Sequence, residues 1–190
     1  MTPRAKPLAA AQRREALIDA TLPLLLEHGR GTTTRQIADA CGVAEGTIFR
    51  VFESKHELFQ AAVLHATDFG PFLADLRTID PDQGLRGVLL DISARLQMRF
   101  RGVFALMTRM GMVQPPQTLR QNEDQRHEAG QIMVALVAPY ADELDCEPRH
   151  LVHLLRLLTF SGTHPHISDG QLLTPEQIVD ALLDGLRTKD

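Results

Sequence analysis

Residues 33–52, which read TTRQIADACGVAEGTIFRVF, constrain the fold of this chain more than any other segment. They predict two short helices joined at Gly42, where glycine accepts the positive φ of a tight turn at little cost. The positions that pack the two helices together are apolar or small: Ile37, Ala38, Cys41, Val43, Ile48 and Val51. This is the spacing of a helix-turn-helix. A plain helical hairpin is the alternative, but these six positions and a capping box of Thr33 with Gln36 favour the helix-turn-helix.

The same spacing leaves Glu45, Gly46, Thr47 and Arg50 on the outer surface of the second helix. A helix that presents such a face can enter the major groove of DNA. Arg50 can pair bidentately with guanine, and Thr47 can meet a thymine methyl group. A phosphate contact or a solvated position is an equal alternative for Arg50. Glu45 lies where the helix dipole favours a negative charge, so capping competes with a contact to cytosine.

Helix signals recur along the rest of the chain, and no run of alternating apolar residues between turns indicates a strand. Ser54 with Glu57 forms a second capping box, and Thr174 precedes a proline at a first helical position. The chain is therefore expected to be all-α. About nine helices are expected, at 9–28, 33–41, 44–51, 54–69, 81–101, 102–112, 121–141, 148–162 and 174–187.

The net charge of −4 over 190 residues argues against a partner as acidic as DNA, but the charge is unevenly distributed. Residues 1–60 hold eight Lys and Arg against seven Asp and Glu, a net of +1. The remaining residues hold twelve against seventeen, a net of −5. DNA binding by the N-terminal part must therefore depend on a few well-placed groups, because bulk attraction is weak.

Several classes of protein are not favoured by the sequence. It has no apolar run of about 18 residues and no secretory signal pattern, so a cytoplasmic protein without membrane contact is expected. Cys41 and Cys146 do not make a disulfide framework, and no Cys/His cluster has the spacing of a zinc site. No phosphate-binding loop or nucleophile motif indicates an enzyme. We therefore expect no catalytic residue, no metal and no cofactor.

The stretch from Arg14 to Leu58 resembles the N-terminal domain of the TetR family of transcriptional regulators, through LPLLLEHG, TTTRQIADACGV, EGTIFRVF and SKHEL. The resemblance implies that Thr33 caps a helix beside a phosphate and that Arg35 projects toward the DNA backbone. It also implies a phosphate contact for Lys55. The residues expected to bind double-stranded DNA are Thr33, Thr34, Arg35, Glu45, Gly46, Thr47, Phe49, Arg50 and Lys55.

Three positions depart from the family pattern. Phe49 stands where the family usually has Tyr, so no hydroxyl is left to bond a phosphate. Ala44 stands where Ser or Thr often caps the recognition helix, and losing a cap typically costs about 1 kcal/mol. Cys41 replaces the usual Ala.

Two helices near the C-terminus are too apolar for the surface of a monomer. Two such helices in each chain suit a two-fold four-helix interface, and VDALLDGLR is similar to the last dimerisation helix of the TetR family. The alternative is a deep core within one chain. The residues expected at the dimer interface are Leu151, Leu154, Leu155, Leu158, Ile178, Leu182 and Leu186.

The middle of the chain is rich in Met and Phe, which can line a cavity for a hydrophobic effector. An ordinary apolar core explains the same pattern, whereas the family resemblance favours the cavity. The residues expected to bind the effector are Phe72, Leu76, Leu96, Phe100, Phe104, Met107, Met133, Tyr140 and Phe160.

The sequence and the resemblance together predict two domains. Residues 1–60 are expected to form an N-terminal arm with the DNA-binding domain, and residues 61–190 a helical domain for effector binding and dimerisation. We expect a homodimeric repressor that a small apolar or aromatic effector releases from a quasi-palindromic operator. Two alternatives stay open: an activator or constitutive DNA binder, and a helical ligand-binding or interaction protein with a non-functional helix-turn-helix.

Overall fold

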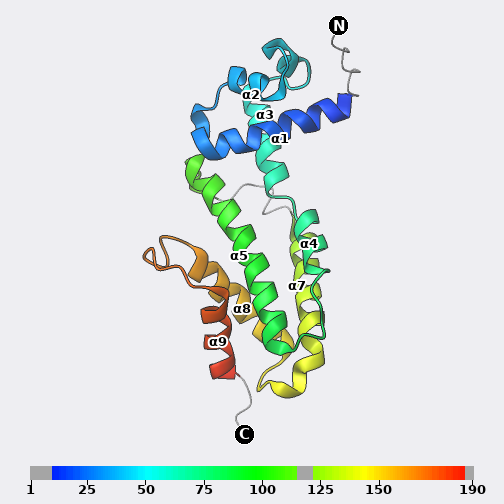
Figure 1. Ribbon diagram of the computed structural model, residues 1–190, viewed down its shortest axis with the longest axis vertical. Coiled ribbons are helices and arrows are strands. Elements are labelled where there is room, and N and C mark those ends of the chain that lie inside the picture. Colours follow the sequence, from blue (N-terminus) through cyan, green and yellow to red (C-terminus); the bar gives the residue numbers. More distant parts are fainter. Residues whose placement is uncertain (1–9, 115–121, 187–190) are drawn as a thin grey trace. The chain divides into compact units, whose positions relative to one another are not determined.

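The computed structural model describes residues 10–114 and 122–186. Its regular elements are all helical in this part of the chain (Figure 1), so the expected all-α class is confirmed. The α-helices are α1 (Ala10–His28), α2 (Thr34–Cys41), α3 (Lys55–Ala66), α4 (Gly70–Leu76), α5 (Leu85–Arg109), α7 (Glu123–Val137), α8 (Pro148–Thr163) and α9 (Pro175–Leu186). The 3₁₀ helices are η1 (Gly29–Gly31), η2 (Glu45–Arg50) and η3 (Ala138–Glu143).

The described residues fall into two compact units. The first unit draws on Met1–Thr67 and Ala105–Thr118, and the second on Asp68–Phe104 and Leu119–Asp190. The division passes through α5, whose last residues belong to the first unit. Each unit has an apolar core of its own.

In the first unit α1 contacts both α2 and α3, and α2 contacts η2. Fully burying a large apolar side chain contributes roughly 1.5–3 kcal/mol, so this core stabilises a unit made of short helices. The buried apolar side chains of this core are Leu17, Ile18, Leu25, Ile37, Ala38, Ile48, Phe52, Leu58, Phe59, Ala61, Ala62, Val63, Leu106 and Met110.

The link between α1 and α2 is held against the end of α5 within this unit. Gly29 has a φ of +57°, a conformation that favours glycine. A Cβ on Gly29 would lie 2.2 Å from the carbonyl oxygen of Arg109. Nε of Arg30 donates a 2.6 Å hydrogen bond to the carbonyl of Met110. The buried hydroxyl of Thr32 donates to the Gly29 carbonyl at 2.9 Å. Hydrogen bonds to Gly29 and to Met110 therefore hold the residues that precede α2.

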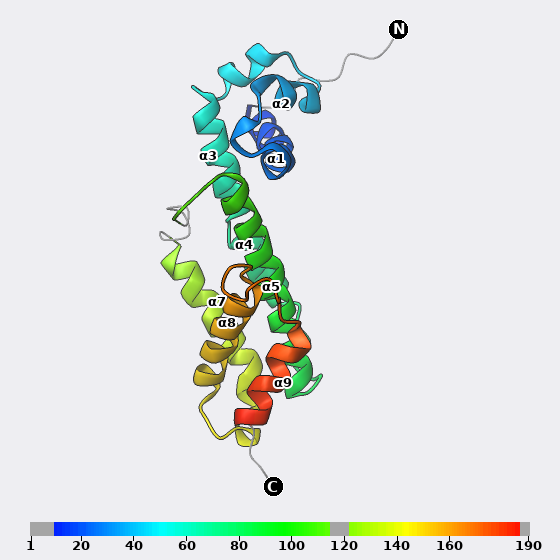
Figure 2. The same ribbon diagram turned by 90° about the vertical axis from the view of Figure 1, so that its left-hand side faces the viewer.

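The second unit packs α4, the first part of α5, α7, α8 and α9 (Figure 2). α7 contacts α4 and α8, and α8 contacts α9. Polar contacts also join α5 to this unit. The hydroxyls of Ser93 and Thr159 lie 3.4 Å apart, and Nε2 of the buried Gln97 donates to the carbonyl of Leu173 at 2.8 Å.

The central helix differs from the expectation. Residues 81–101 and 102–112 were expected as two helices, but they contribute to the single helix α5. α5 begins only after Gly84, because this residue has a φ of +82° and cannot be helical. Gly102 lies inside α5 without ending it, since one interior glycine costs a helix only about 1 kcal/mol relative to alanine.

Two other expected helices are shorter than expected. The helix expected over 54–69 ends before α4, which carries Pro71 in its first turn. The helix expected over 121–141 gives way to η3 at Pro139, which lacks the amide hydrogen that an α-helix needs. Residues 9, 121 and 187, where expected helices begin or end, lie outside the described residues.

In the residues that the structure describes, none of the helices combines the length and the apolar character needed to cross a membrane. The same residues contain no group of three or more side chains placed to hold a metal ion.

Candidate nucleic-acid interface

The first helix of the motif is fixed at both ends by its own sequence. The hydroxyl of Thr33 accepts a 3.2 Å hydrogen bond from the backbone N–H of Gln36, and Oε1 of Gln36 accepts one of 2.8 Å from the backbone N–H of Thr33. This box satisfies N–H groups that the start of a helix leaves unpaired. At the other end Gly42 has a φ of 65°, and its N–H bonds to the carbonyl of Asp39 at 3.1 Å. The expected cap and glycine turn are confirmed.

The second helix of the motif is a 3₁₀ helix, η2, and not the α-helix expected over 44–51. Ala44 gives it no side-chain cap, and short uncapped segments commonly form the tighter 3₁₀ geometry. Ile48 is 0% exposed and anchors η2 on α2. Gly46 and Arg50 consequently lie on the exposed side of η2.

Two guanidinium groups lie on the exposed surface of the motif. Arg35 of α2 and Arg50 of η2 are both exposed, and neither has an acidic partner within the described residues. A guanidinium in this state keeps all its donors available for phosphate or for a guanine edge.

The third expected cation, Lys55, is half-buried at the start of α3. Its Nζ donates a long 3.5 Å hydrogen bond to the carbonyl of Arg30 and lies 5.0 Å from the ring centre of Phe59. These contacts position the ammonium, which has further donors for a phosphate. The sequence did not indicate that Arg30 positions Lys55, because the contact joins two separate segments.

Glu45, the acidic residue among those expected to bind DNA, accepts a hydrogen bond from within the helix-turn-helix. The hydroxyl of Thr34 donates a 2.5 Å hydrogen bond to Oε1 of Glu45, which links α2 to η2. Glu45 also stands in the first turn of η2, where the helix dipole favours its charge. Thr34 and Glu45 therefore hold α2 and η2 together. Their contact with DNA stays a prediction.

The last two expected residues lie together on η2. The ring of Phe49 is 51% exposed, which is unusual for a side chain of this kind. Thr47 is half-buried, and its backbone N–H donates to the carbonyl of Ala44 at 2.8 Å. An exposed aromatic ring can contact a thymine methyl group.

Cys41, which replaces the usual alanine, has a structural role. Its Sγ lies 3.5 Å from the carbonyl oxygen of Ala16, on α1. Burial raises the pKa of the Cys41 thiol, so the side chain stays protonated and packs as a small apolar group.

None of the residues expected to bind an effector lines the two cavities between α7 and α8. Four are buried in the core of the second unit: Phe72, Leu76, Leu96 and Met133. Three form a ring cluster with centroids 5.2–6.1 Å apart: Phe100, Phe104 and Phe160. The hydroxyl of Tyr140 donates to the carbonyl of Pro81, and Met107 belongs to the first unit. Their role in effector binding stays a prediction.

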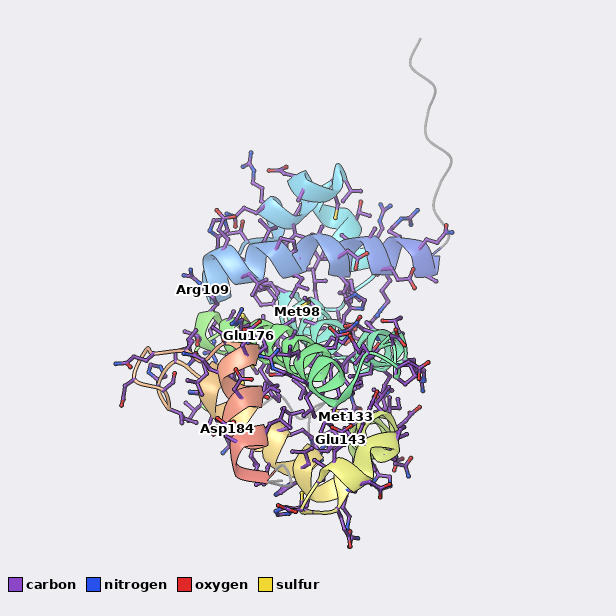
Figure 3. All side chains as sticks on the ribbon, turned by 60° about the horizontal axis from the view of Figure 1, so that its bottom comes forward. Met98, Arg109, Met133, Glu143, Glu176 and Asp184 are labelled. Atoms are coloured by element: carbon purple, nitrogen blue, oxygen red, sulfur yellow. The ribbon has the colours of Figure 1, made fainter. Side chains whose placement is uncertain are left out.

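Most of the expected dimer residues face the core of their own chain. Four are buried: Leu151, Leu155, Ile178 and Leu182. These four side chains belong to the core of their own chain, and their place at a dimer interface stays a prediction. Leu154 and Leu158 are half-buried, and the side chain of Leu186 lies outside the described part. In the side-chain view Met133 lies inside the unit, whereas Glu176 and Asp184 belong to exposed positions of α9 (Figure 3).

Comparisons with known proteins agree with this architecture. A family profile described as bacterial regulatory proteins of the tetR family matches residues 17–62. The uncharacterized HTH-type transcriptional regulator YvkB of Bacillus subtilis (strain 168) is 41% identical over 59 residues, which make up 30% of this chain and 31% of that protein. The match therefore spans about a third of the length of this relative.

Solved structures of similar fold cover nearly the whole chain. A TetR transcription regulator from Haloarcula marismortui ATCC 43049 is 18% identical, with a TM-score of 0.65 over 94% of this chain and 100% of that one. The transcriptional regulator FadR from Bacillus subtilis, solved in complex with stearoyl-CoA, is 15% identical. Its TM-score is 0.56 over 90% of this chain and 95% of that one. At sequence identities this low, the structural similarity shows that the fold is shared.

A capped helix, a glycine turn and a second helix with an exposed Arg50 make a helix-turn-helix within an all-helical protein. Residues 17–62 therefore match the tetR-family profile, and the chain shares its fold with a solved TetR transcription regulator.

Proposed function

We propose that this protein is a DNA-binding transcriptional regulator, with residues 1–60 as the DNA-binding domain and residues 61–190 as the domain for effector binding and dimerisation. The observation that supports DNA binding most strongly is the pair of exposed guanidinium groups of Arg35 and Arg50, without acidic partners in the described residues. Because residues 1–60 carry a net charge of only +1, these groups supply most of the attraction.

Each of the expected DNA-binding groups has a separate task in the proposed complex. Arg50 and Thr47 face base edges in the major groove, where they distinguish guanine and thymine. Arg35 and Lys55 bind phosphates, as does the N-terminus of α2 at Thr33, which fixes the register of the protein on the duplex.

Footprinting on the DNA upstream of the protein's own gene tests this assignment. Arg50→Ala should weaken protection by about 5- to 150-fold, since a base contact is worth about 1–3 kcal/mol. Lys55→Ala should lower the salt slope of binding by about 0.9. The control Arg86→Ala removes a cation that pairs with Asp180 in the second unit at 2.9 Å, and it should bind as the wild type does.

Two results would contradict the assignment. Unchanged protection by both variants would remove Arg50 and Lys55 from the interface. A lack of protection by the wild-type protein at low salt would reject DNA binding itself, because the phosphate term is largest there.

We also propose a homodimer with α8 and α9 at its interface, because two half-sites about 34–36 Å apart need two recognition helices. The exposed side of α8 offers Leu157, which is 52% exposed, next to the half-buried Leu154 and Leu158. Leu157→Glu should raise the dimer dissociation constant in analytical ultracentrifugation. The control Leu64→Glu changes a similarly exposed leucine of α3 and should leave the dimer intact. Equal effects of the two changes would contradict this interface.

The regulator is proposed to be a repressor that a small, largely hydrophobic effector releases. The fold shared with FadR, which was solved with stearoyl-CoA, supports an effector of this kind. An effector acts only through its different affinities for the DNA-binding and the released state. The footprint is therefore repeated with a panel of apolar and aromatic compounds. Loss of protection with one compound supports release, whereas protection retained with all of them indicates a constitutive DNA binder.

A further inference from the structure

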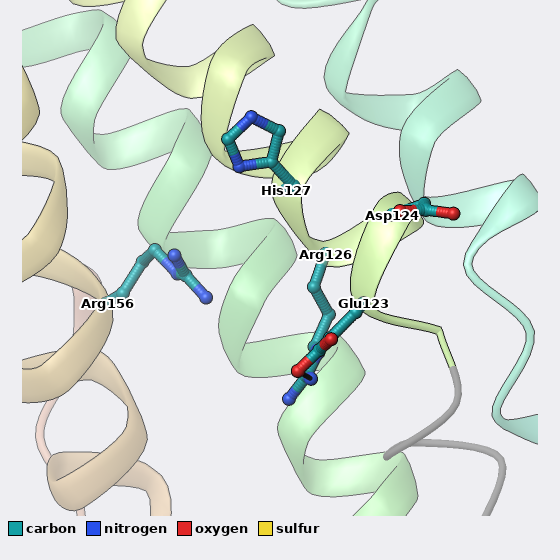
Figure 4. A pocket seen from close by; sticks show the side chains of 5 residues that line it. All are labelled: Glu123, Asp124, Arg126, His127 and Arg156. Carbon is teal, nitrogen blue, oxygen red and sulfur yellow. Dashed lines mark ion pairs between the residues drawn. The ribbon is translucent and has the colours of Figure 1, made fainter.

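Two adjoining cavities lie between α7 and α8 in the second unit. Figure 4 shows the five side chains that line the first of them. The two cavities share three basic side chains, Arg126 and His127 from α7 and Arg156 from α8. The first, of about 450 Å³, also has Glu123 and Asp124 in its wall. The second, of about 490 Å³, has no acidic residue in its wall, and we call it the α7/α8 cleft. A cavity of this size is in the range that small molecules occupy.

Arg156 differs from the other arginines of the α7/α8 cleft. Arg149 forms an ion pair with Glu147, and Arg126 has a carboxylate oxygen 3.6 Å away. Within the described ranges, no carboxylate lies at ion-pair distance from the guanidinium of Arg156. Nη1 of Arg156 lies 3.8 Å from the place that a Cβ on Gly130 would take, so the side chain reaches from α8 to α7 over a position without a side chain.

This position is electrostatically unfavourable for a cation. Burial lowers the pKa of the Arg156 guanidinium, and repulsion from Arg126 lowers it further. Arginine nevertheless keeps its proton in proteins, so the protein cannot relieve the cost by releasing it. An oxyanion between the two guanidinium groups would offset both the burial and the repulsion through charge-assisted hydrogen bonds.

The other residues that line the α7/α8 cleft suit the apolar part of a ligand. Val134 and Ala135 of α7 and Val152 of α8 line it, and none of them has a polar side chain. His127 and Gln131 also line it, and their side-chain nitrogens lie 3.0 Å apart. Apolar side chains beside two arginines suit a molecule with an anionic head and a short apolar tail.

We propose that the α7/α8 cleft binds a small amphiphilic carboxylate. The carboxylate lies between Arg156 and Arg126, and the tail lies against Val134 and Ala135. The nine residues expected from the sequence to bind an effector take no part in this site. The proposal concerns binding by the second unit alone, so its outcome does not depend on DNA binding.

Isothermal titration calorimetry of the full chain tests the proposal with octanoate, acetate and 1-octanol as probes. Octanoate should bind at least about tenfold more tightly than acetate, which lacks the tail, and than 1-octanol, which lacks the charge. Arg156→Gln should weaken octanoate binding by about tenfold or more, because a charge-assisted contact is lost. The control Arg77→Gln removes an exposed ion pair with Glu128, also of α7, and should change the affinity by less than about twofold.

Thermal unfolding separates loss of the site from loss of the fold. Without octanoate, Arg156→Gln should melt at or above the wild-type temperature, because an unpaired, half-buried charge has been removed. With octanoate it should lack the rise in melting temperature that the wild type shows. Arg126→Gln is the second variant and should also weaken octanoate binding. The proposal is overturned if the wild type does not bind octanoate, if 1-octanol or acetate binds equally well, or if Arg156→Gln binds octanoate as the wild type does.

Discussion

Alanine at Gly29 and at Gly42 tests the contact between the end of α5 and the link that follows α1. Both glycines have positive φ angles, +57° and +65°, so each substitution costs about 1–2 kcal/mol for the left-handed conformation. Their surroundings differ. A Cβ at Gly29 would lie 2.2 Å from the Arg109 carbonyl oxygen, whereas one at Gly42 meets nothing within 4 Å. Only Gly29→Ala must displace backbone, which adds about 1–3 kcal/mol.

Thermal unfolding followed by far-UV circular dichroism compares the two variants. For a chain of this length 1 kcal/mol corresponds to about 2–4 °C, so Gly29→Ala should melt about 2–12 °C below Gly42→Ala. Gly42→Ala is the matched control, because it has the same backbone cost without the overlap. Equal melting temperatures would refute the reasoning, since they would mean that the Arg109 carbonyl does not pack on Gly29.

Three further predictions concern the helix-turn-helix. Ile48→Ala should lower the unfolding free energy by about 2–5 kcal/mol in urea denaturation, because Ile48 is 0% exposed and its loss leaves a cavity; a loss below about 1 kcal/mol would contradict this burial. Phe49→Tyr should tighten operator binding in fluorescence anisotropy by about fivefold, through one added hydrogen bond to a phosphate. Its melting temperature should not change, since the ring is 51% exposed, and unchanged affinity would place Phe49 away from the phosphates. Because burial raises the pKa of Cys41, its thiolate fraction at pH 8 is lower than that of glutathione. Mass spectrometry should show slower alkylation of Cys41 by iodoacetamide, and an equal rate would contradict the pKa shift.

The helix-turn-helix was predictable because its signals are local. The box of Thr33 and Gln36 and the positive φ of Gly42 each depend on residues a few positions apart, and both occur in the structure. The contact of Thr34 with Glu45 was not predictable, because it depends on how closely η2 approaches α2.

The length of α5 shows tertiary structure overriding a local signal. Two helices were expected over 81–101 and 102–112, whereas α5 continues through Gly102. A glycine costs about 1 kcal/mol in a helix interior, whereas burial of Leu106 and Met110, both in the core of the first unit, contributes roughly 1.5–3 kcal/mol each. The continuous helix is therefore the more stable solution, and no rule that considers one segment at a time can weigh these terms.

An apolar stripe indicates that a helix face is covered, but it does not indicate what covers it. Leu151 and Leu155 satisfy the spacing of a dimer interface, yet both are buried in the core of their own chain. Leu157 and Phe160, outside that stripe, are the large apolar side chains that α8 leaves exposed. The α7/α8 cleft has no sequence signal for a related reason. The guanidinium of Arg156 fits there because Gly130, on a different helix, has no side chain. The site is formed by two helices together, so the sequence pattern of neither helix predicts it.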